Sequence, residues 1–256
     1  MVLQELSLLP VLTFHDISTD PAVISFPPGI FRHGLAKLHE HGYRTLSLVD
    51  AAQCWQKNQA FPARSFVITF DDGYESVYAK AFPVLQEFAM SATVFLPVGK
   101  DKVADLDRRL PALEGRAMLS WRRIQEMHKH GISFGAHTVT HADLTSLPVD
   151  EVKPEILTSK QRIEDVLGTA VSSFAYPFGR YNTTIRNFVA QHFTCACSDA
   201  LGFLNGASDL YAIERVDAYY LRSNRLFNLM LTGFFPSYIK ARALPRRLRR
   251  RFWQSH

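Results

Sequence analysis

Cysteine is scarce in this chain, which has three in 256 residues, at positions 54, 195 and 197. An odd number, with two of them separated by one residue in an apolar run, does not make a disulfide framework. We expect Cys195 and Cys197 to be small buried hydrophobic residues. The pattern predicts a reducing compartment, and therefore a cytoplasmic protein.

Long apolar runs are also missing. No uncharged stretch approaches the ~20 residues that a helix needs to cross a bilayer. The first five residues have no basic segment ahead of an apolar core, so no secretory signal is predicted.

Acidic residues are absent from the last part of the chain. Residues 218–256 contain no Asp or Glu and hold nine of the Lys and Arg residues, so the net charge of +5 reflects this tail. Its apolar stretch 226–235 and basic cluster 246–251 predict contact with an anionic membrane surface through residues 222–253, on the inner face of the membrane. The alternative is a packed helix with a solvated basic end. An acidic body without a recognised module argues against nucleic-acid binding.

Short apolar runs alternate with amphipathic stretches along residues 1–217. The expected strands are Val11–Phe14, Thr45–Val49, Ser65–Phe70, Ala92–Leu96, Ile132–Gly135, Ser172–Tyr176, Thr194–Cys197 and Ala212–Val216. The expected helices are Gly29–His41, Glu75–Phe88, Trp121–His130, Asp150–Leu167 and Tyr181–Gln191. Asp150 and Gly168 have the residue types of a helix start and a helix end. The alternation predicts a parallel α/β sheet, open or closed into a barrel.

Polar residues follow several of these strands directly. The strand ends carry His15, Asp71 with Asp72, His137, Pro177 and Arg215. In a parallel barrel the carboxyl ends of the strands meet on one face, where active sites form. The sequence therefore predicts a single site built from these residues.

The two carboxylates and the pair His137 and His141 indicate metal chemistry. Alone, Asp-Asp-Gly is also a turn signal. The spacing of the two histidines predicts that both imidazoles lie on one face of a helical turn, which can also be an exposed helix face without a metal. Together, two imidazoles and one carboxylate leave open positions for water and substrate, as in catalytic zinc sites. Neighbouring side chains of an extended chain point in opposite directions, which leaves one Asp free as a base. Non-haem iron oxygenases use the same three ligands, but the spare Asp favours hydrolysis.

Three ordered motifs resemble those of the polysaccharide deacetylases, the NodB-homology carbohydrate esterases. They are Thr-Phe-Asp-Asp-Gly-Tyr at 69–74, His-Thr-x-x-His at 137–141 and Phe-Ala-Tyr-Pro-Phe-Gly at 174–179. The resemblance covers about residues 10–217. It implies a distorted (β/α)7 barrel at 1–217, followed by a basic, apolar tail at 218–256. It also implies metal-dependent removal of acetyl groups, chiefly N-acetyl, from a glycan.

The resemblance assigns roles to the motif residues. Asp71 resembles the general base, and Asp72, His137 and His141 resemble the metal ligands. The metal is expected to be zinc, with nickel, cobalt or iron as alternatives. The backbone N–H of Phe178, after Pro177, resembles the donor to the oxyanion. Phe178, Tyr74 and Tyr176 are candidates to stack on a sugar ring, with barrel packing as the alternative for each.

Two departures from the family pattern matter. The family has an Arg where this chain has Ala175, and no late Leu-x-His motif is present. Some poly-N-acetylglucosamine deacetylases share both departures and take the late His from the first strand. By that resemblance His15 is the candidate general acid and Arg215 the candidate substitute for the missing Arg. Otherwise His15 bonds to the backbone and Arg215 forms a surface ion pair.

The sequence thus predicts a glycan deacetylase whose partner is an acetylated glycan. Residues 222–253 are expected to contact the membrane or the machinery of glycan synthesis. Two alternatives remain: a hydrolase of non-sugar amides on the same fold, and a non-catalytic subunit of glycan assembly.

Overall fold

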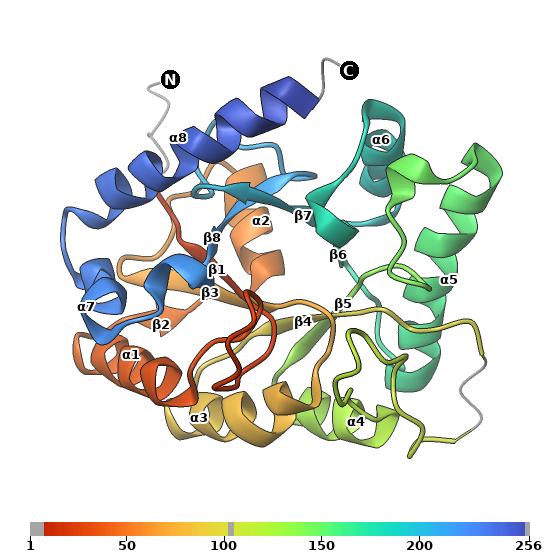
Figure 1. Ribbon diagram of the computed structural model, residues 1–256, viewed down its shortest axis with the longest axis horizontal. Helices are drawn as coiled ribbons and strands as arrows, with labels where there is room; N and C mark the ends of the chain where they lie inside the picture. Colours follow the sequence, from red (N-terminus) through yellow and green to blue (C-terminus); the bar gives the residue numbers. More distant parts are fainter. Residues whose placement is uncertain (1–7, 102–104, 254–256) are drawn as a thin grey trace.

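The computed structural model describes residues 8–101 and 105–253, without the side chains of 246–253. Its strands are β1 (Val11–Phe14), β2 (Arg44–Thr45), β3 (Ser65–Phe70), β4 (Thr93–Leu96), β5 (Ser133–Ala136), β6 (Ser173–Ala175), β7 (Cys195–Leu201) and β8 (Ile213–Asp217). Its α-helices are α1 (Pro28–Glu40), α2 (Leu48–Gln56), α3 (Phe82–Glu87), α4 (Trp121–Lys129), α5 (Val149–Leu167), α6 (Thr183–His192), α7 (Asn224–Phe227) and α8 (Phe235–Trp253). The helices surround the strands (Figure 1).

The sheet closes on itself. Strand β1 pairs in parallel with both β3 and β8, and the other strands follow in the order β8, β7, β6, β5, β4, β3. The short β2 lies outside this ring and pairs only with β3. The predicted (β/α)7 barrel is therefore confirmed, with β1, the first strand in sequence, between β3 and β8.

Side chains of alternate residues face the two sides of each strand. On β3, Phe66, Ile68 and Phe70 belong to the core cluster that includes the apolar faces of the helices. Val67, between them, belongs to a second cluster together with Phe95 of β4. Because the period is two, Thr69 and Asp71 continue the side of Val67, toward the barrel interior. Strand alternation thus aims Asp71 into the mouth of the barrel.

Cys195 and Cys197 also lie in the second cluster, where both are fully buried. The prediction that they are small buried hydrophobic residues is confirmed, and all three cysteines are free thiols. Burial raises the pKa of the Cys197 thiol to about 12. Neither buried thiol is therefore a ready nucleophile.

The expected strand Thr45–Val49 is largely wrong. Only Arg44–Thr45 is extended, and helix α2 begins at Leu48. The Ser47 side chain accepts a hydrogen bond from the backbone N–H of Asp50, a helix-start arrangement. The buried face of α2 is formed by Leu48, Ala51 and Ala52. Part of the apolar run that predicted a strand therefore belongs to a helix.

Helix α5 begins one residue earlier than expected. Pro148 is its N-cap residue, and Asp150 lies in the first turn rather than at the cap. Its end agrees with the prediction, because Gly168 is the C-cap residue in the left-handed region at φ 68°. Pro154 lies inside the helix, where a proline cannot donate a hydrogen bond to the carbonyl oxygen four residues earlier.

The segment after β8 packs on the barrel. Phe227, Met230 and Phe235 are buried, and they belong to the same core cluster as the strands. Helix α8 lies across one side of the barrel (Figure 1), where Ile239 is buried in that cluster. These apolar side chains are thus occupied within the protein. The basic cluster 246–251 lies outside the described side chains, so membrane contact stays a prediction.

No helix in the described part of the chain is long and apolar enough to span a bilayer.

The contact between α1 and α7 can be tested with one methyl group. A Cβ at Gly34 would overlap the Phe227 ring, whereas a Cβ at Gly29 meets no heavy atom within 4 Å. We expect Gly34→Ala to lower the free energy of unfolding by roughly 1–3 kcal/mol, because overpacking forces neighbours apart. Gly29→Ala in the same helix should cause no loss. Urea unfolding measures both, and equal stability of the two variants would contradict this packing.

Candidate active site

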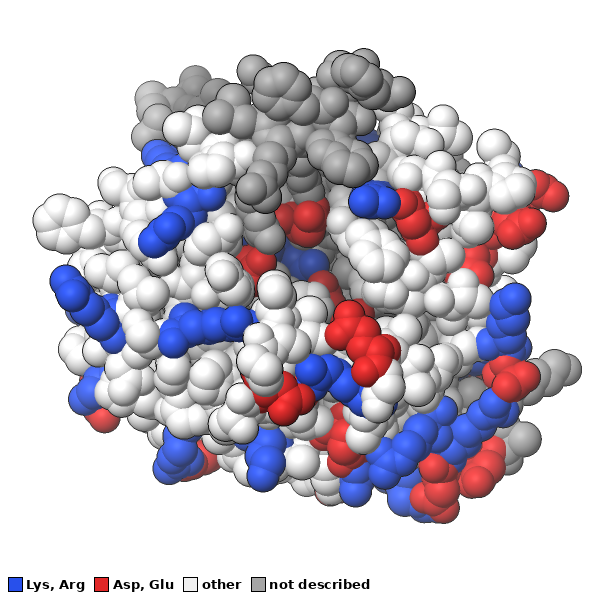
Figure 2. All heavy atoms as spheres, in the orientation of Figure 1, with Lys and Arg blue, Asp and Glu red and all other residues white. Residues whose placement is uncertain are grey.

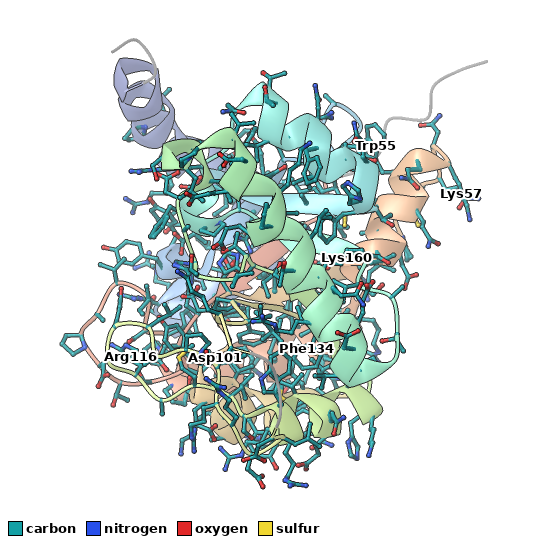
Figure 3. All side chains as sticks on the ribbon, turned by 90° about the vertical axis from the view of Figure 1, so that its right-hand side faces the viewer. Trp55, Lys57, Asp101, Arg116, Phe134 and Lys160 are labelled. Carbon is teal, nitrogen blue, oxygen red and sulfur yellow. The ribbon has the colours of Figure 1, made fainter. Side chains whose placement is uncertain are left out.

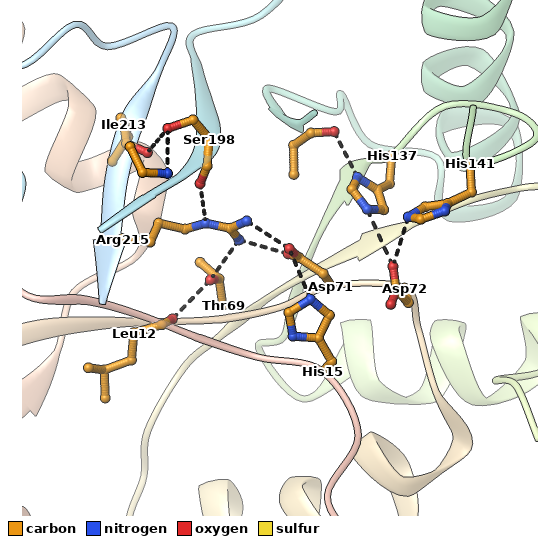
Figure 4. A network of polar contacts seen from close by, with 12 residues as sticks. Leu12, His15, Thr69, Asp71, Asp72, His137, His141, Ser198, Ile213 and Arg215 are labelled. Atoms are coloured by element: carbon orange, nitrogen blue, oxygen red, sulfur yellow. Dashed lines mark hydrogen bonds and ion pairs between the residues drawn. The ribbon is translucent and has the colours of Figure 1, made fainter. Parts of the chain in front are cut away.

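The polar residues at the strand ends converge at the mouth of the barrel (Figure 4). Asp71 and Asp72 follow β3, His15 follows β1, and His137 follows β5. Arg215 lies within β8 and points toward Asp71. The structure thus brings together residues far apart in sequence, such as Asp71 and Arg215, which are separated by 144 positions.

One carboxylate and two imidazoles form a compact donor set. The Asp72 Oδ1 atom lies 3.4 Å from Nε2 of His137 and 3.2 Å from Nε2 of His141. A tetrahedral zinc ion with bonds of 2.0–2.1 Å separates its ligand atoms by about 3.3–3.4 Å. The donor types and the spacing of the donor atoms both fit a metal ion. Among the described residues, the group of His, Cys, Asp or Glu side chains close enough together to hold an ion is Asp72, His137 and His141.

The two adjacent carboxylates separate for a different reason from the one expected. Asp72 is not extended, because its backbone lies in the left-handed region at φ 73°. The Asp72 carboxylate therefore faces the histidines while Asp71 faces Arg215. Burial opposes ionisation of Asp72, yet hydrogen bonds with His137 and His141 hold its pKa well below the ordinary value.

The expected helical turn at His137–His141 is wrong. These residues form an irregular loop after β5, with Thr138 at φ 69° and His141 at φ 58°. The Nδ1 atom of His137 lies 2.7 Å from the carbonyl oxygen of Ala175, to which its N–H can donate. That bond leaves Nε2 free toward Asp72, the usual arrangement of a metal-binding histidine.

The second carboxylate forms a buried ion pair. Nη1 and Nη2 of Arg215 each donate to one oxygen of Asp71, at 2.7 Å. Arg215 also donates from Nε to the carbonyl oxygen of Ser198 and from Nη1 to Thr69 Oγ1. Burial alone would raise the pKa of Asp71, but the Arg215 charge and hydrogen bonds outweigh it and lower that pKa. Asp71 is therefore ionised at neutral pH.

His15 lies on the other side of Asp71. Its Nε2 atom is 3.8 Å from Asp71 Oδ2, and 28% of its side chain is exposed. The residue after it, Asp16, was not predicted to belong to the site. Asp16 is buried and accepts hydrogen bonds from Ser18, Ser76 and Arg116. These bonds anchor the β1–α1 connection that carries His15, and no motif could reveal those from Ser76 and Arg116 because these donors are distant in sequence.

The third motif presents one aromatic side chain to solvent. Phe178 is 57% exposed, and its ring centroid lies 4.8 Å from that of His141. Its backbone is left-handed at φ 57°, directly after Pro177. Tyr74 and Tyr176 are 2% and 1% exposed, so they pack in the barrel and their ring faces cannot stack on a sugar. The expected stacking role is wrong for both tyrosines.

The strand-end residues line a pocket of about 260 Å³. Its lining includes His15, Asp71, Asp72, His137, His141, Tyr176, Phe178 and Arg215. Its further acidic lining comes from Glu114, Asp199 and Asp217. The space-filling view shows a hollow near the middle of this face, where acidic and basic side chains meet (Figure 2). The site is thus open to a ligand from solvent.

A parallel barrel with a two-histidine, one-carboxylate set and a second, ionised carboxylate at its strand ends defines a metal-dependent hydrolase. Residues 58–193 match the sequence model of one such family, polysaccharide deacetylase. The chain belongs to the polysaccharide deacetylase family. The predicted enzyme class, a hydrolase that removes acetyl groups from glycans, is confirmed.

Individual relatives agree with this assignment. The chain is 29% identical over 209 residues to the putative polysaccharide deacetylase YxkH of Bacillus subtilis, covering 81% of this chain and 70% of that protein. It is 27% identical over 128 residues to the poly-β-1,6-N-acetyl-D-glucosamine N-deacetylase of Escherichia coli K12. That match covers 48% of this chain but only 19% of the relative.

Solved structures resemble the barrel closely. The deacetylase PplD of Streptococcus pyogenes, in complex with acetate, superposes with a TM-score of 0.73 at 26% identity, over 82% of this chain and 92% of that one. IcaB of Ammonifex degensii superposes with a TM-score of 0.70 at 24% identity, over 83% and 94%. The second likeness concerns the fold alone.

The Asp71–Arg215 pair should be essential for stability as well as geometry. We expect Arg215→Met to lower the free energy of unfolding by about 3–5 kcal/mol, because it strands a buried carboxylate without its partner. Arg122→Met, which removes an equally bidentate but exposed partner from Asp107, should cause no measurable loss. Chemical denaturation of both variants provides the comparison. Equal effects would show that the buried pair contributes no more than a surface pair.

Proposed function

We propose that this protein hydrolyses the N-acetyl group of an amino sugar within a glycan, with Asp71 as general base and His15 as general acid. The observation that carries the proposal is the position of Asp71. Its ionised carboxylate is held by Arg215, adjoins the metal-type donor set through Asp72 and faces His15 at 3.8 Å. Base, acid and metal ligands thus surround a single pocket.

Asp72, His137 and His141 would hold the metal ion, and we propose zinc because two imidazoles and one carboxylate are a zinc-type set. When bound, the ion polarises the acetyl carbonyl and lowers the pKa of a coordinated water. Nickel, cobalt and iron accept the same donors, so metal analysis of the purified protein decides between them.

Asp71 would take the proton from the attacking water. Because both of its oxygens accept hydrogen bonds from Arg215, the carboxylate cannot rotate away from the pocket. Arg215 would therefore orient the base, in place of the Arg that the family has at the position of Ala175. A lowered pKa keeps the base ready at neutral pH, at some cost in basicity.

His15 would protonate the departing amine. Its ring is partly exposed to the pocket, and a histidine can hold or release a proton near neutral pH. The backbone N–H of Phe178 would donate to the oxyanion, an interaction typically worth ~2.7–4 kcal/mol in the transition state. Its left-handed backbone, next to the ring of His141, supports this placement.

For the substrate we propose a β-1,6-linked N-acetylglucosamine glycan. The support is similarity to relatives named for that activity, together with an acid supplied by the first strand. Acetate release from β-1,6-linked oligomers, from chitin oligomers and from cyclic and linear amides tests the proposal. Faster release from any of the other substrates would contradict it.

Replacing the proposed base should separate catalysis from metal binding. We expect Asp71→Asn to reduce acetate release by roughly 10²–10⁴-fold, the typical contribution of general acid–base catalysis, while bound zinc is retained. Asp72→Asn is the matched control on the neighbouring carboxylate, and it should lose the metal as well. Near-normal turnover by Asp71→Asn would refute the assignment of the base.

Replacing the proposed acid should affect the leaving group selectively. We expect His15→Ala to reduce kcat on an N-acetyl substrate by roughly 10²–10⁴-fold with unchanged zinc content. An acetyl ester with a nitrophenolate leaving group needs no protonation, so its hydrolysis should fall far less. Equal losses on both substrates would show that His15 does not act as the acid.

A further inference from the structure

We infer that Glu155 of helix α5 is a positioning residue for the metal site, which it acts on by holding the His137–His141 loop in its metal-binding shape. Glu155 is not one of the three proposed ligands. The inference rests on the proposed metal set, and it does not depend on which glycan is cleaved.

The loop has an unfavourable backbone. Thr138 and His141 both lie in the left-handed region, at φ 69° and 58°. For residues other than glycine such conformations are unfavourable, and they persist only where surrounding contacts enforce them. Thr138 is β-branched, which makes its conformation especially unfavourable. The loop therefore needs external partners to keep both imidazoles directed at Asp72.

Glu155 accepts three hydrogen bonds from one side of this loop. Its Oε2 atom accepts hydrogen bonds from the backbone N–H of Val139, at 2.8 Å, and of Thr140, at 2.9 Å. Its Oε1 atom accepts from the Thr140 hydroxyl at 2.9 Å. The carboxylate thus binds the two residues between the left-handed positions. Hydrogen bonds to a charged acceptor are among the stronger ones in proteins.

The segment after strand β4 holds the same loop from the other side. The backbone N–H of Val98 donates to the carbonyl oxygen of Thr138, and that of Gly99 donates to Val139, at 3.2 and 2.7 Å. Helix α5 secures this segment too, because Arg162 donates to the carbonyl oxygens of Gly99 and Lys100. Both supports of the loop are therefore tied to one helix.

Helix α5 is rigid enough for this task. Its core face buries Val152, Ile156, Ser159 and Ile163 against the barrel. Figure 3 looks onto this helix, where Lys160 donates to Glu164 and to the carbonyl oxygen of Val171. Glu155 extends from a helix whose apolar face is buried in the core, so its carboxylate has a defined position relative to β5 and its loop.

Zinc affinity of the whole chain tests the inference, measured by competition with a chromophoric chelator. We expect Glu155→Ala to weaken zinc binding by about 10–100-fold, as is typical when a residue supporting a metal ligand is removed. Glu155→Gln should bind nearly as well as the wild type, since its amide oxygen can accept both backbone hydrogen bonds. Glu151→Ala, at an exposed position one turn earlier, is the matched control and should bind normally.

A milder variant covers the case in which Glu155→Ala does not fold. Thr140→Val removes only the hydroxyl donor to Glu155, and we expect a smaller but measurable loss of zinc affinity. The melting temperatures of the zinc-free variants should remain close to that of the zinc-free wild type, because the contact shapes a loop and not the core. A large fall in melting temperature without any change in zinc affinity would indicate a purely structural role and overturn the inference.

Two outcomes separate this inference from the proposed function. If the wild type binds zinc tightly and Glu155→Ala binds it equally well, the positioning role is wrong while the metal site stands. If the wild type binds neither zinc, cobalt nor nickel, the metal site and the positioning role both fail.

Discussion

The buried pair between Asp71 and Arg215 is the interaction on which the rest of the site depends. Removing two charges from water is costly, and only close, fully hydrogen-bonded contact compensates for it. Here Nη1 and Nη2 of Arg215 donate to both carboxylate oxygens, and Thr69 and Ser198 accept two further hydrogen bonds from the guanidinium. The pair joins β3 to β8 across β1, so the same contact fixes the Asp71 carboxylate and supports the closure of the barrel.

Backbone strain is concentrated around this pair. Asp72, Thr138, His141 and Phe178 are all left-handed, although none is a glycine. Asp72, His141 and Phe178 contribute a carboxylate, an imidazole and an aromatic ring to the pocket lining, and Thr138 directly follows His137. Such conformations need support from their surroundings, which explains why groups outside the motifs, such as Glu155 and Asp16, accept several hydrogen bonds each. A strained site thus requires a rigid scaffold.

A closed barrel also places the first strand of the chain beside the last one. Strands next to each other in the ring can come from any part of the chain, and β1 lies beside β8 as well as β3. A histidine after β1 therefore reaches the position that a residue near the end of the barrel could also occupy. The segment after β8 completes the core on the outside, where Phe227 packs against Gly34 of α1. Residues 218–245 accordingly contribute to the fold.

The sequence by itself determined the class of this protein. Strand periodicity and strand-end polar residues predicted the barrel face, and three spaced motifs predicted the family, because these features depend on local pattern and chemical type. It could not determine that Ser47 starts a helix within an apolar run, that Tyr74 and Tyr176 are buried, or that the two histidines lie on a strained loop. Only the tertiary structure decided which groups surround Asp71 and which hold the His137–His141 loop. Those contacts join residues far apart in the chain, and their formation depends on ring closure and packing, which no local pattern records.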